Sequence, residues 1–186
     1  MAGQVKGAAL LARGAFVRSE FGDDAWKLVV DGTSGEARRT LGGSILSSKW
    51  YPFAISHELD EAIVRTLGAG DRAIFKRIGA RSARENLEGP HKSFLGSGDP
   101  AAFMERTSAI YRFYYDTGRR EWLATGPTSG VMTTHDAETY SQADCLTVIG
   151  WYEEALAMCG ARDVVIREPS CRAAGADVCR YEVRWS

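Results

Sequence analysis

The sequence predicts an α+β fold, with an N-terminal helical body followed by a small antiparallel sheet of about four strands that is backed by a helix. Two observations lead to this prediction. Apolar residues recur at helical spacing over the first two thirds of the chain, and the last third holds short strand-like segments bounded by glycine-containing turns. The 186 residues contain no linker, internal repeat or low-complexity tract. We therefore expect a single domain over 1–186, mostly helical over 1–118 and built of sheet plus helix over 119–186.

Glycine, aspartate and proline set the expected limits of the helices. Gly22 separates the first two helices, and the two aspartates after it are expected to cap the second. Gly68 to Gly70 ends a later helix, and Asp99-Pro100 supplies a cap followed by proline at the first helical position. The stretch from Ser44 to Phe53 is expected to be irregular. The apolar residues that mark the helices are Leu10, Leu11, Phe16, Val17, Trp26, Val29, Val30, Leu59, Ile63, Val64, Leu67, Ile74, Phe75, Ile78, Phe103, Met104, Ile110, Tyr111 and Tyr114.

The period of the pattern changes after residue 118. Four strands are expected, with a long helix between the second and the third that ends at a glycine. The last strand alternates Tyr181, Val183 and Trp185 with charged residues, which is typical of a strand with one buried face. The expected strands are Glu121–Ala124, Gly130–Thr134, Val164–Glu168 and Val178–Trp185, and the helix is Ala137–Cys159.

Composition argues against several classes of partner and activity. The 23 Lys and Arg residues balance 24 Asp and Glu residues to a net charge of −1, without the basic surface that binds nucleic acid or a membrane. No window approaches the roughly 20 apolar residues of a membrane span, and no signal peptide is evident, so we expect a cytoplasmic protein. Asp116-Thr117-Gly118 is expected to be a turn, and His57-Glu58 lacks the second histidine of a zinc protease. We therefore expect no enzyme activity.

The four cysteines all lie in the last quarter of the chain, where they suggest metal or redox chemistry in a reducing compartment. Glu168 ends one expected strand, Cys171 lies just past the bend, and Cys179 begins the next strand. Cys145, at the start of the preceding helix, could reach the same point. Three thiolates and a carboxylate suit structural zinc, and flanking arginines could offset their negative charge: Arg167, Arg172 and Arg180. The alternative is that Cys145 and Cys159 are buried helix residues and that the other two are ordinary loop thiols.

The C-terminal part resembles a known family. The segment from Cys145 through Gly150-Trp151 to Arg180 is similar to the C-terminal half of the four-vinyl-reductase domain, in the version found in bacterial activators that sense phenol-like aromatics. The resemblance implies a zinc ion on the matching residues Cys145, Glu168, Cys171 and Cys179. The wider superfamily includes haem-nitric-oxide sensors and transport-particle tethering subunits. The N-terminal part is similar to its stand-alone, myxobacterial-type members at Gly7, Phe16-Val17, Phe21-Gly22, Trp26 and Trp50-Tyr51-Pro52.

The resemblance implies the NO-signalling/Golgi-transport ligand-binding fold, with a small apolar cavity between the helical body and the sheet. We expect Phe103, Ile110, Tyr111 and Trp122 to line this cavity, because they are aromatic or aliphatic positions where the helical part joins the sheet. The polar tips of Tyr111 and Trp122 could orient a hydroxylated aromatic ligand. The alternative is that these side chains are simply core. Haem is not expected, since the 101–118 segment contains no histidine and no Tyr-x-Ser-x-Arg sequence occurs.

The expected function is that of a small-molecule-binding sensor domain with a structural zinc site. Its ligand would be a small hydrophobic or aromatic molecule. The phenol-type sensors continue into an ATPase and a DNA-binding module, whereas this sequence ends at Ser186, so the signal is expected to pass to a separate protein partner. The alternative is a dimeric adaptor or scaffold of the tethering-subunit type that binds no small ligand, and a homodimer is a possible assembly in either case.

Overall fold

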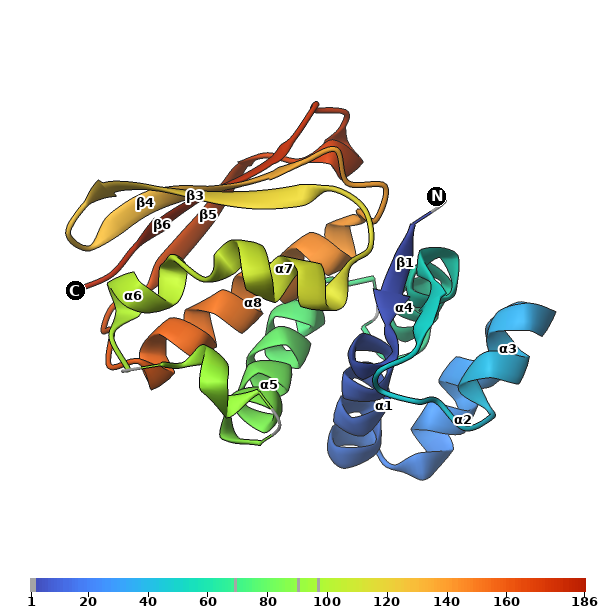
Figure 1. Ribbon diagram of the computed structural model, residues 1–186. Coiled ribbons are helices and arrows are strands. Elements are labelled where there is room, and N and C mark those ends of the chain that lie inside the picture. The colour runs from blue at the N-terminus through green and yellow to red at the C-terminus, as the bar shows by residue number, and fades with distance from the viewer. Residues whose placement is uncertain (1–2, 69, 90, 97) are drawn as a thin grey trace.

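A computed structural model of the chain describes residues 3–68, 70–89, 91–96 and 98–186 (Figure 1). Two short 3₁₀ helices, Lys92–Phe94 and Arg172–Ala174, accompany the main elements. In chain order these are β1 (Gln4–Lys6), α1 (Gly7–Phe21), α2 (Asp23–Asp31), α3 (Gly35–Leu41), β2 (Trp50–Pro52), α4 (Phe53–Thr66), α5 (Ile74–Glu88), α6 (Pro100–Met104), α7 (Thr107–Tyr114), β3 (Arg119–Gly126), β4 (Ser129–His135), α8 (Gln142–Met158), β5 (Val165–Ser170) and β6 (Cys179–Arg184). None of the helices in the described ranges is long and apolar enough to cross a membrane.

The C-terminal strands form one antiparallel sheet in the order β3-β4-β6-β5. Arg120 of β3 lies opposite Thr134 of β4, and Met132 of β4 lies opposite Tyr181 of β6. Alternate residues of β6 are buried, as expected for a strand with one covered face. Figure 1 shows this face resting on α7 and α8, while α1 to α4 lie together at the side of that layer. The expected α+β fold with a four-stranded sheet is confirmed.

Buried side chains form two hydrophobic clusters. One lies among α1 to α4 and the first half of α5, with members such as Leu10, Leu59 and Phe75. The other lies between α6 to α8, the second half of α5 and the sheet, and includes Phe103. Leu146 of α8 packs against both clusters. Helices α5 and α8 therefore belong to the boundary at which the two clusters meet.

Two glycines let α5 and α8 approach each other closely. A Cβ atom added to Gly79 of α5 would lie 2.1 Å from the carbonyl oxygen of Thr147. A Cβ atom added to Gly150 of α8 would lie 2.0 Å from the carbonyl oxygen of Lys76. Neither distance is tolerable for a side chain, so the two helix backbones are in direct contact at this crossing.

Some local predictions are corrected by the structure. The stretch expected to be irregular contains β2, which pairs with β1; a three-residue strand gives too short a pattern to recognise. The helix expected after Asp99 is two helices, α6 and α7, although Asp99 does cap the first through the amide of Ala102 at 3.0 Å. The aspartates expected to cap α2 do not do so: the N-cap position is Gly22, and Asp23 and Asp24 lie inside the first turn of the helix. Ala69, within the predicted glycine stop, lies outside the described residues.

Candidate functional site

A pocket lies where α1, α5, α7, β3 and α8 meet, close to the boundary between the two hydrophobic clusters. Its cavity volume is about 50 Å³. Small side chains of α1, Ala9 and Ala12, form one wall, and neither is fully buried. The other lining residues are Arg13, also of α1, and Ile78, Ser82, Ile110, Tyr111, Tyr114, Tyr115, Arg120, Thr147, Val148, Trp151 and Tyr152.

Several polar groups that line this pocket have no hydrogen-bond partner. The hydroxyls of Tyr114 and Tyr152 and the indole Nε1 of Trp151 are buried and unpaired. Tyr152 is only 2% exposed. Buried polar atoms without partners cost free energy, so three of them around one cavity indicate that a polar atom of a ligand or of water belongs there.

Arg120 is a buried cation in the same wall, with 5% of its surface exposed. Its Nε donates to Thr134 Oγ1 at 2.9 Å. The guanidinium carbon lies 4.8 Å from the ring centre of Tyr111 and 5.8 Å from those of Tyr152 and Tyr181. Aromatic rings stabilise a cation in this way. Within the described part of the chain, however, no carboxylate forms an ion pair with Arg120.

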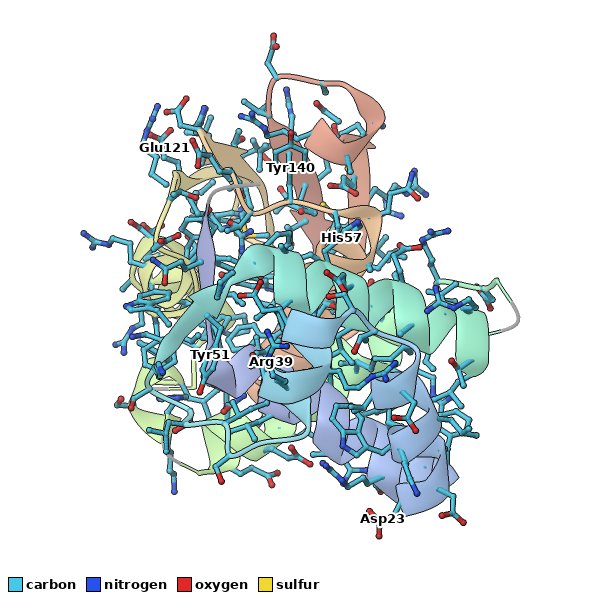
Figure 2. The ribbon with its side chains drawn as sticks, turned by 90° about the vertical axis from the view of Figure 1, so that its right-hand side faces the viewer. Asp23, Arg39, Tyr51, His57, Glu121 and Tyr140 are labelled. Atoms are coloured by element: carbon cyan, nitrogen blue, oxygen red, sulfur yellow. The ribbon has the colours of Figure 1, made fainter. Side chains whose placement is uncertain are left out.

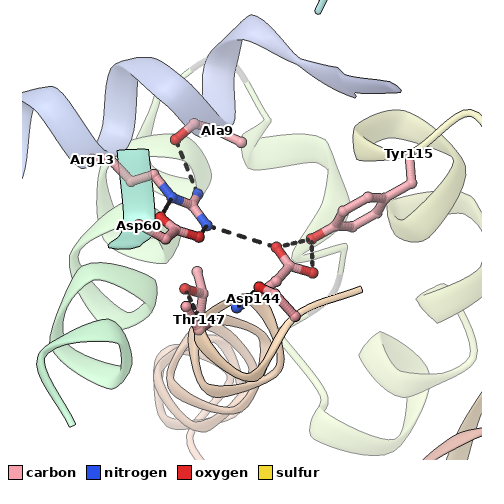
Figure 3. A network of polar contacts seen from close by, with 8 residues as sticks. Ala9, Arg13, Asp60, Tyr115, Asp144 and Thr147 are labelled. Atoms are coloured by element: carbon pink, nitrogen blue, oxygen red, sulfur yellow. Dashed lines mark hydrogen bonds and ion pairs between the residues drawn. The ribbon is translucent and has the colours of Figure 1, made fainter. Parts of the chain in front are cut away.

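A network of polar side chains, shown in Figure 3, joins four segments next to the pocket, and two of its members, Arg13 and Tyr115, line the pocket. Arg13 of α1 donates from Nε to Asp60 Oδ1 of α4 at 2.5 Å and from Nη2 to Asp60 Oδ2 at 3.0 Å. Arg13 Nη2 also lies 3.7 Å from Asp144 Oδ1 of α8. The hydroxyl of Tyr115, which follows α7, donates to Asp144 at 2.9 Å. Arg13 and Asp60 are 2% and 0% exposed, so this is a fully buried ion pair.

Burial sets the protonation of this network. Burial raises the pKa of Asp144 to about 6, although the Arg13 guanidinium opposes the shift. Burial also raises the pKa of Asp60 against the opposing effect of Arg13. For Arg13, burial lowers the pKa, but the charge and hydrogen bond of Asp60 outweigh it and keep the guanidinium charged. The network thus contains one cation, Arg13, which interacts with the carboxyl groups of both Asp60 and Asp144.

The second candidate site contains three cysteines and a glutamate. Cys145 lies in the first turns of α8, Glu168 in β5, Cys171 directly after β5, and Cys179 at the start of β6. One ligand atom from each residue lies within 4.8 Å of all the others. The structure therefore brings together the four residues that the sequence pattern singled out, and it leaves Cys159 at the far end of α8, outside the group.

The spacing of the sulfur atoms suits a tetrahedral metal ion. Cys145 Sγ lies 3.7 Å from both Cys171 Sγ and Cys179 Sγ. Metal–thiolate bonds of about 2.3 Å in a tetrahedron place two sulfurs about 3.8 Å apart, whereas a disulfide requires about 2.05 Å. Glu168 Oε1 is buried without a hydrogen-bond partner, and the amide of Arg172 donates to Cys179 Sγ at 3.3 Å. A carboxylate oxygen without a hydrogen-bond partner and a thiolate that accepts a hydrogen bond from a backbone amide are both typical of residues that bind a cation.

Hydrogen bonds among the three thiols shift their pKa values in opposite directions. Hydrogen bonding with Cys145 lowers the pKa of Cys171 to about 5 and also lowers that of Cys179. The same contacts raise the pKa of Cys145. Burial raises the pKa of Glu168 to about 7. Two of the three thiols are therefore disposed to be thiolates, the form that binds metal.

The residues expected to bind a ligand fall in different places. Ile110 and Tyr111 line the pocket. Phe103 is fully buried against Trp151, with ring centres 6.2 Å apart, and Trp122 stacks on Trp185 of the sheet at 6.3 Å. Arg120 was missed because a charged residue at the start of a strand is normally exposed. Only the strand register of the structure, in which Arg120 lies opposite the buried Thr134, places it on the face of the sheet that covers the helices.

The chain has the fold of H-NOX domains. An H-NOX protein from S. oneidensis in the Fe(II)NO ligation state superposes with a TM-score of 0.76 at 13% identity, covering 97% of this chain and 99% of that one. The unliganded Fe(II) H-NOX protein from K. algicida gives 0.74 at 9% identity, covering 97% and 96%. An oxygen-binding H-NOX domain related to soluble guanylate cyclases gives 0.71 at 10% identity, covering 97% and 95%.

The chain itself belongs to the family of proteins of unknown function DUF2378, whose model matches residues 51–186. No curated protein matches it in sequence. The comparisons thus show that the chain shares the fold of H-NOX domains, while the resemblance to four-vinyl-reductase domains and phenol sensors gains no support from them.

The expected cofactor, zinc and no haem, is contradicted by these neighbours, because they are haem-binding domains. A further neighbour, with a TM-score of 0.67 at 12% identity, is a protein in which distortion of the porphyrin modulates the haem redox potential. The expectation rested on a missing histidine and a missing short motif. Short motifs of this kind are not retained between proteins that share only about a tenth of their residues, whereas the fold is.

The described residues do not fit a haem in their present positions. The cavity of about 50 Å³ is far below the roughly 300 Å³ or more of sites that enclose a cofactor. No histidine is among the described lining residues, where the phenols of four tyrosines are the side chains able to ligate iron. His57 lies on α4 (Figure 2), His91 packs on Phe113, and His135 pairs with Glu121 on the sheet. We therefore derive no chemistry through a haem.

Proposed function

We propose that this protein is a small-molecule-binding sensor domain that passes its ligand state to a separate protein partner. The observation that carries the proposal is the pocket between α1, α5, α7 and α8, whose lining includes three buried polar groups without partners. The likeness in fold to H-NOX domains, which include one in the Fe(II)NO ligation state and one in complex with oxygen, supports a small ligand. The cavity of about 50 Å³ also favours a ligand smaller than an aromatic ring, since a cavity of roughly 150 Å³ is occupied by benzene.

The position of the pocket supports a role in signalling. Its walls come from α1, which belongs to one hydrophobic cluster, and from α7, which belongs to the other. A ligand that fills the pocket contacts both clusters at once and favours one relative position of the two. A ligand shifts such an equilibrium only by the difference between its affinities for the two states.

The test is to identify what the pocket retains in protein purified under native conditions. We expect native mass spectrometry to detect a small molecule bound to the wild-type chain, and absorbance to report haem if that is the ligand. Ala12→Phe fills the pocket from α1 and should abolish retention, whereas Leu11→Phe adds the same ring to an exposed position of α1 and should not. Equal retention by wild type and Ala12→Phe would contradict the proposal. A dimer that never binds a small molecule would instead favour the adaptor alternative.

We further propose that Cys145, Glu168, Cys171 and Cys179 bind one thiophilic divalent cation with a structural role. Support comes from the sulfur spacing of 3.7 Å and from the unpaired Glu168 Oε1. Elemental analysis of the purified protein is expected to find one equivalent of metal and to identify it. Cys171→Ser should lose this metal, whereas Cys159→Ser, which changes a thiol outside the group, should keep it. Full metal content in Cys171→Ser would show that these are ordinary thiols.

A further inference from the structure

Arg120 has more hydrogen-bond donors than its surroundings use. A guanidinium carries five N–H donors; in the described structure Nε of Arg120 donates to Thr134 Oγ1, and the Tyr152 hydroxyl lies near enough to accept from the guanidinium as well. The side chain is 5% exposed, so bulk water does not surround the others. A buried charge without a hydrogen-bonded partner is costly, and proteins normally supply an anion to it.

The neighbouring acids do not fill this role. Asp144 receives the hydroxyl of Tyr115 at 2.9 Å and faces Arg13 at 3.7 Å. Asp60 is bound by Arg13 through both of its oxygens. The rings of Tyr111, Tyr152 and Tyr181 lie around the Arg120 guanidinium and stabilise its charge through their faces. Arg120 also lines the pocket, so a ligand bound there can accept from the donors that these contacts leave over.

The size and the polarity of the pocket limit the class of ligand that it can bind. The cavity of about 50 Å³ is about a third of the roughly 150 Å³ that encloses benzene, so it has room for a group of a few heavy atoms. Its other walls include the apolar side chains of Ile78, Ile110 and Val148. The hydroxyl of Tyr152 is an unpaired donor at the same cavity. A carboxylate matches the planar fork of an arginine, and a short alkyl group matches the apolar wall.

We propose that the ligand class of this pocket is a small monocarboxylate of about the size of acetate or propionate, held by the guanidinium of Arg120. This inference rests on the proposed function and specifies its ligand. The carboxylate would accept two parallel hydrogen bonds from the terminal nitrogens of Arg120 and would supply an acceptor for the Tyr152 hydroxyl. Binding is non-covalent, and no co-reactant takes part.

The experiment measures binding of propionate and of its uncharged isostere propionamide by NMR or calorimetry at constant ionic strength. We expect the wild-type protein to bind propionate at least about tenfold more tightly than propionamide, as charge-assisted hydrogen bonds are stronger than neutral ones. Arg120→Gln should weaken propionate binding about 10- to 100-fold. Arg119→Gln removes the same charge from the adjacent exposed residue, which pairs with Glu121 and Asp136, and should leave binding within about twofold.

The comparison of the two probes on wild-type protein keeps the test decisive even where Arg120→Gln does not fold. Equal affinity for propionate and propionamide, or propionate binding that survives in a folded Arg120→Gln protein, overturns the carboxylate class. If propionamide binding is then lost in Ala12→Phe, the pocket is still a small-molecule site and the proposed function stands. Failure of wild-type protein to bind either probe also overturns the carboxylate proposal, and retention of another ligand on purification decides the proposed function separately.

Discussion

Arg13 and Asp60 show how a single buried pair connects distant parts of the chain. They lie 47 positions apart in sequence and join α1 to α4 through two hydrogen bonds. A buried ion pair need not stabilise a fold relative to an apolar pair, since both charges lose their hydration. Removal of one partner is different, because the other charge then remains in the interior without compensation.

Asp60→Asn is therefore expected to destabilise the protein strongly. The substitution keeps the shape of the side chain but removes the charge that faces Arg13, and we expect a loss of about 3–5 kcal/mol in the free energy of unfolding. Urea denaturation followed by tryptophan fluorescence measures it. Glu61→Gln changes the adjacent charge, whose partner Arg72 is exposed, and should cost less than about 1 kcal/mol. Equal effects of the two substitutions would show that the Arg13–Asp60 pair contributes no more than a surface pair.

At the scale of elements, the crossing of α5 and α8 depends on two residues that lack a side chain. Gly79 and Gly150 bring the helices into backbone contact, and α8 carries residues of both candidate sites. A methyl group at this crossing has to push the helices apart, because the atoms that it meets belong to the backbone and cannot rotate away. The spacing of the two helices thus determines the width of the pocket.

We expect Gly150→Ala to destabilise the protein by at least about 1–3 kcal/mol, the range for overpacked interiors, although alanine is the better helix former. Gly35→Ala is the matched control: it lies in α3, and its added Cβ would meet Arg39 Nη1 at an ordinary 3.6 Å. Thermal unfolding monitored by circular dichroism provides the comparison. A Gly150→Ala protein as stable as Gly35→Ala would mean that the helices are not in contact at this point.

At the scale of the whole molecule, the cluster of Cys145, Glu168, Cys171 and Cys179 lies where the hairpin of β5 and β6 meets the beginning of α8, and the metal ion proposed there would tie the two together. Its residues come from three elements that are separated in sequence. Because the unfolded chain does not hold these ligands together, the binding of a metal ion there contributes to the stability of the fold. Asp144, the residue before Cys145, belongs to the buried polar network of Figure 3.

Removal of bound metal with a chelator should loosen one part of the molecule more than the other. Hydrogen exchange is expected to increase in 168–182 and in the first turns of α8, because these segments carry the ligands. Exchange in α2 and α3, which belong to the other hydrophobic cluster, should change little. Cys159→Ser protein treated in the same way serves as the control and should match wild type. A uniform change over the chain would contradict a local structural role for the metal.

The fold class could be predicted from sequence, because strands such as β6 have a strict two-residue period. The proximity of Cys171 and Cys179, which flank a short hairpin loop, also follows from local geometry, whereas that of Cys145 depends on how α8 packs. That these residues bind a metal stays a prediction. The pocket depends on the packing of five segments, and its chemistry depends on which way Arg120 faces. Sequence reasoning placed Ile110 and Tyr111 at the cavity but had no means of locating Arg120, which local pattern alone marks as a surface residue.

The contact between Gly79 and Gly150 has a consequence for how the pocket can enlarge. Two helices whose main chains already touch have no side-chain layer between them that could rearrange, so α5 and α8 behave as a fixed floor. Another wall is α1, which contributes the methyl groups of Ala9 and Ala12 and the side chain of Arg13. A ligand larger than the cavity is therefore expected to displace α1 and, with it, the hydrophobic cluster of α1 to α4. The size of the ligand then sets how far α1 moves.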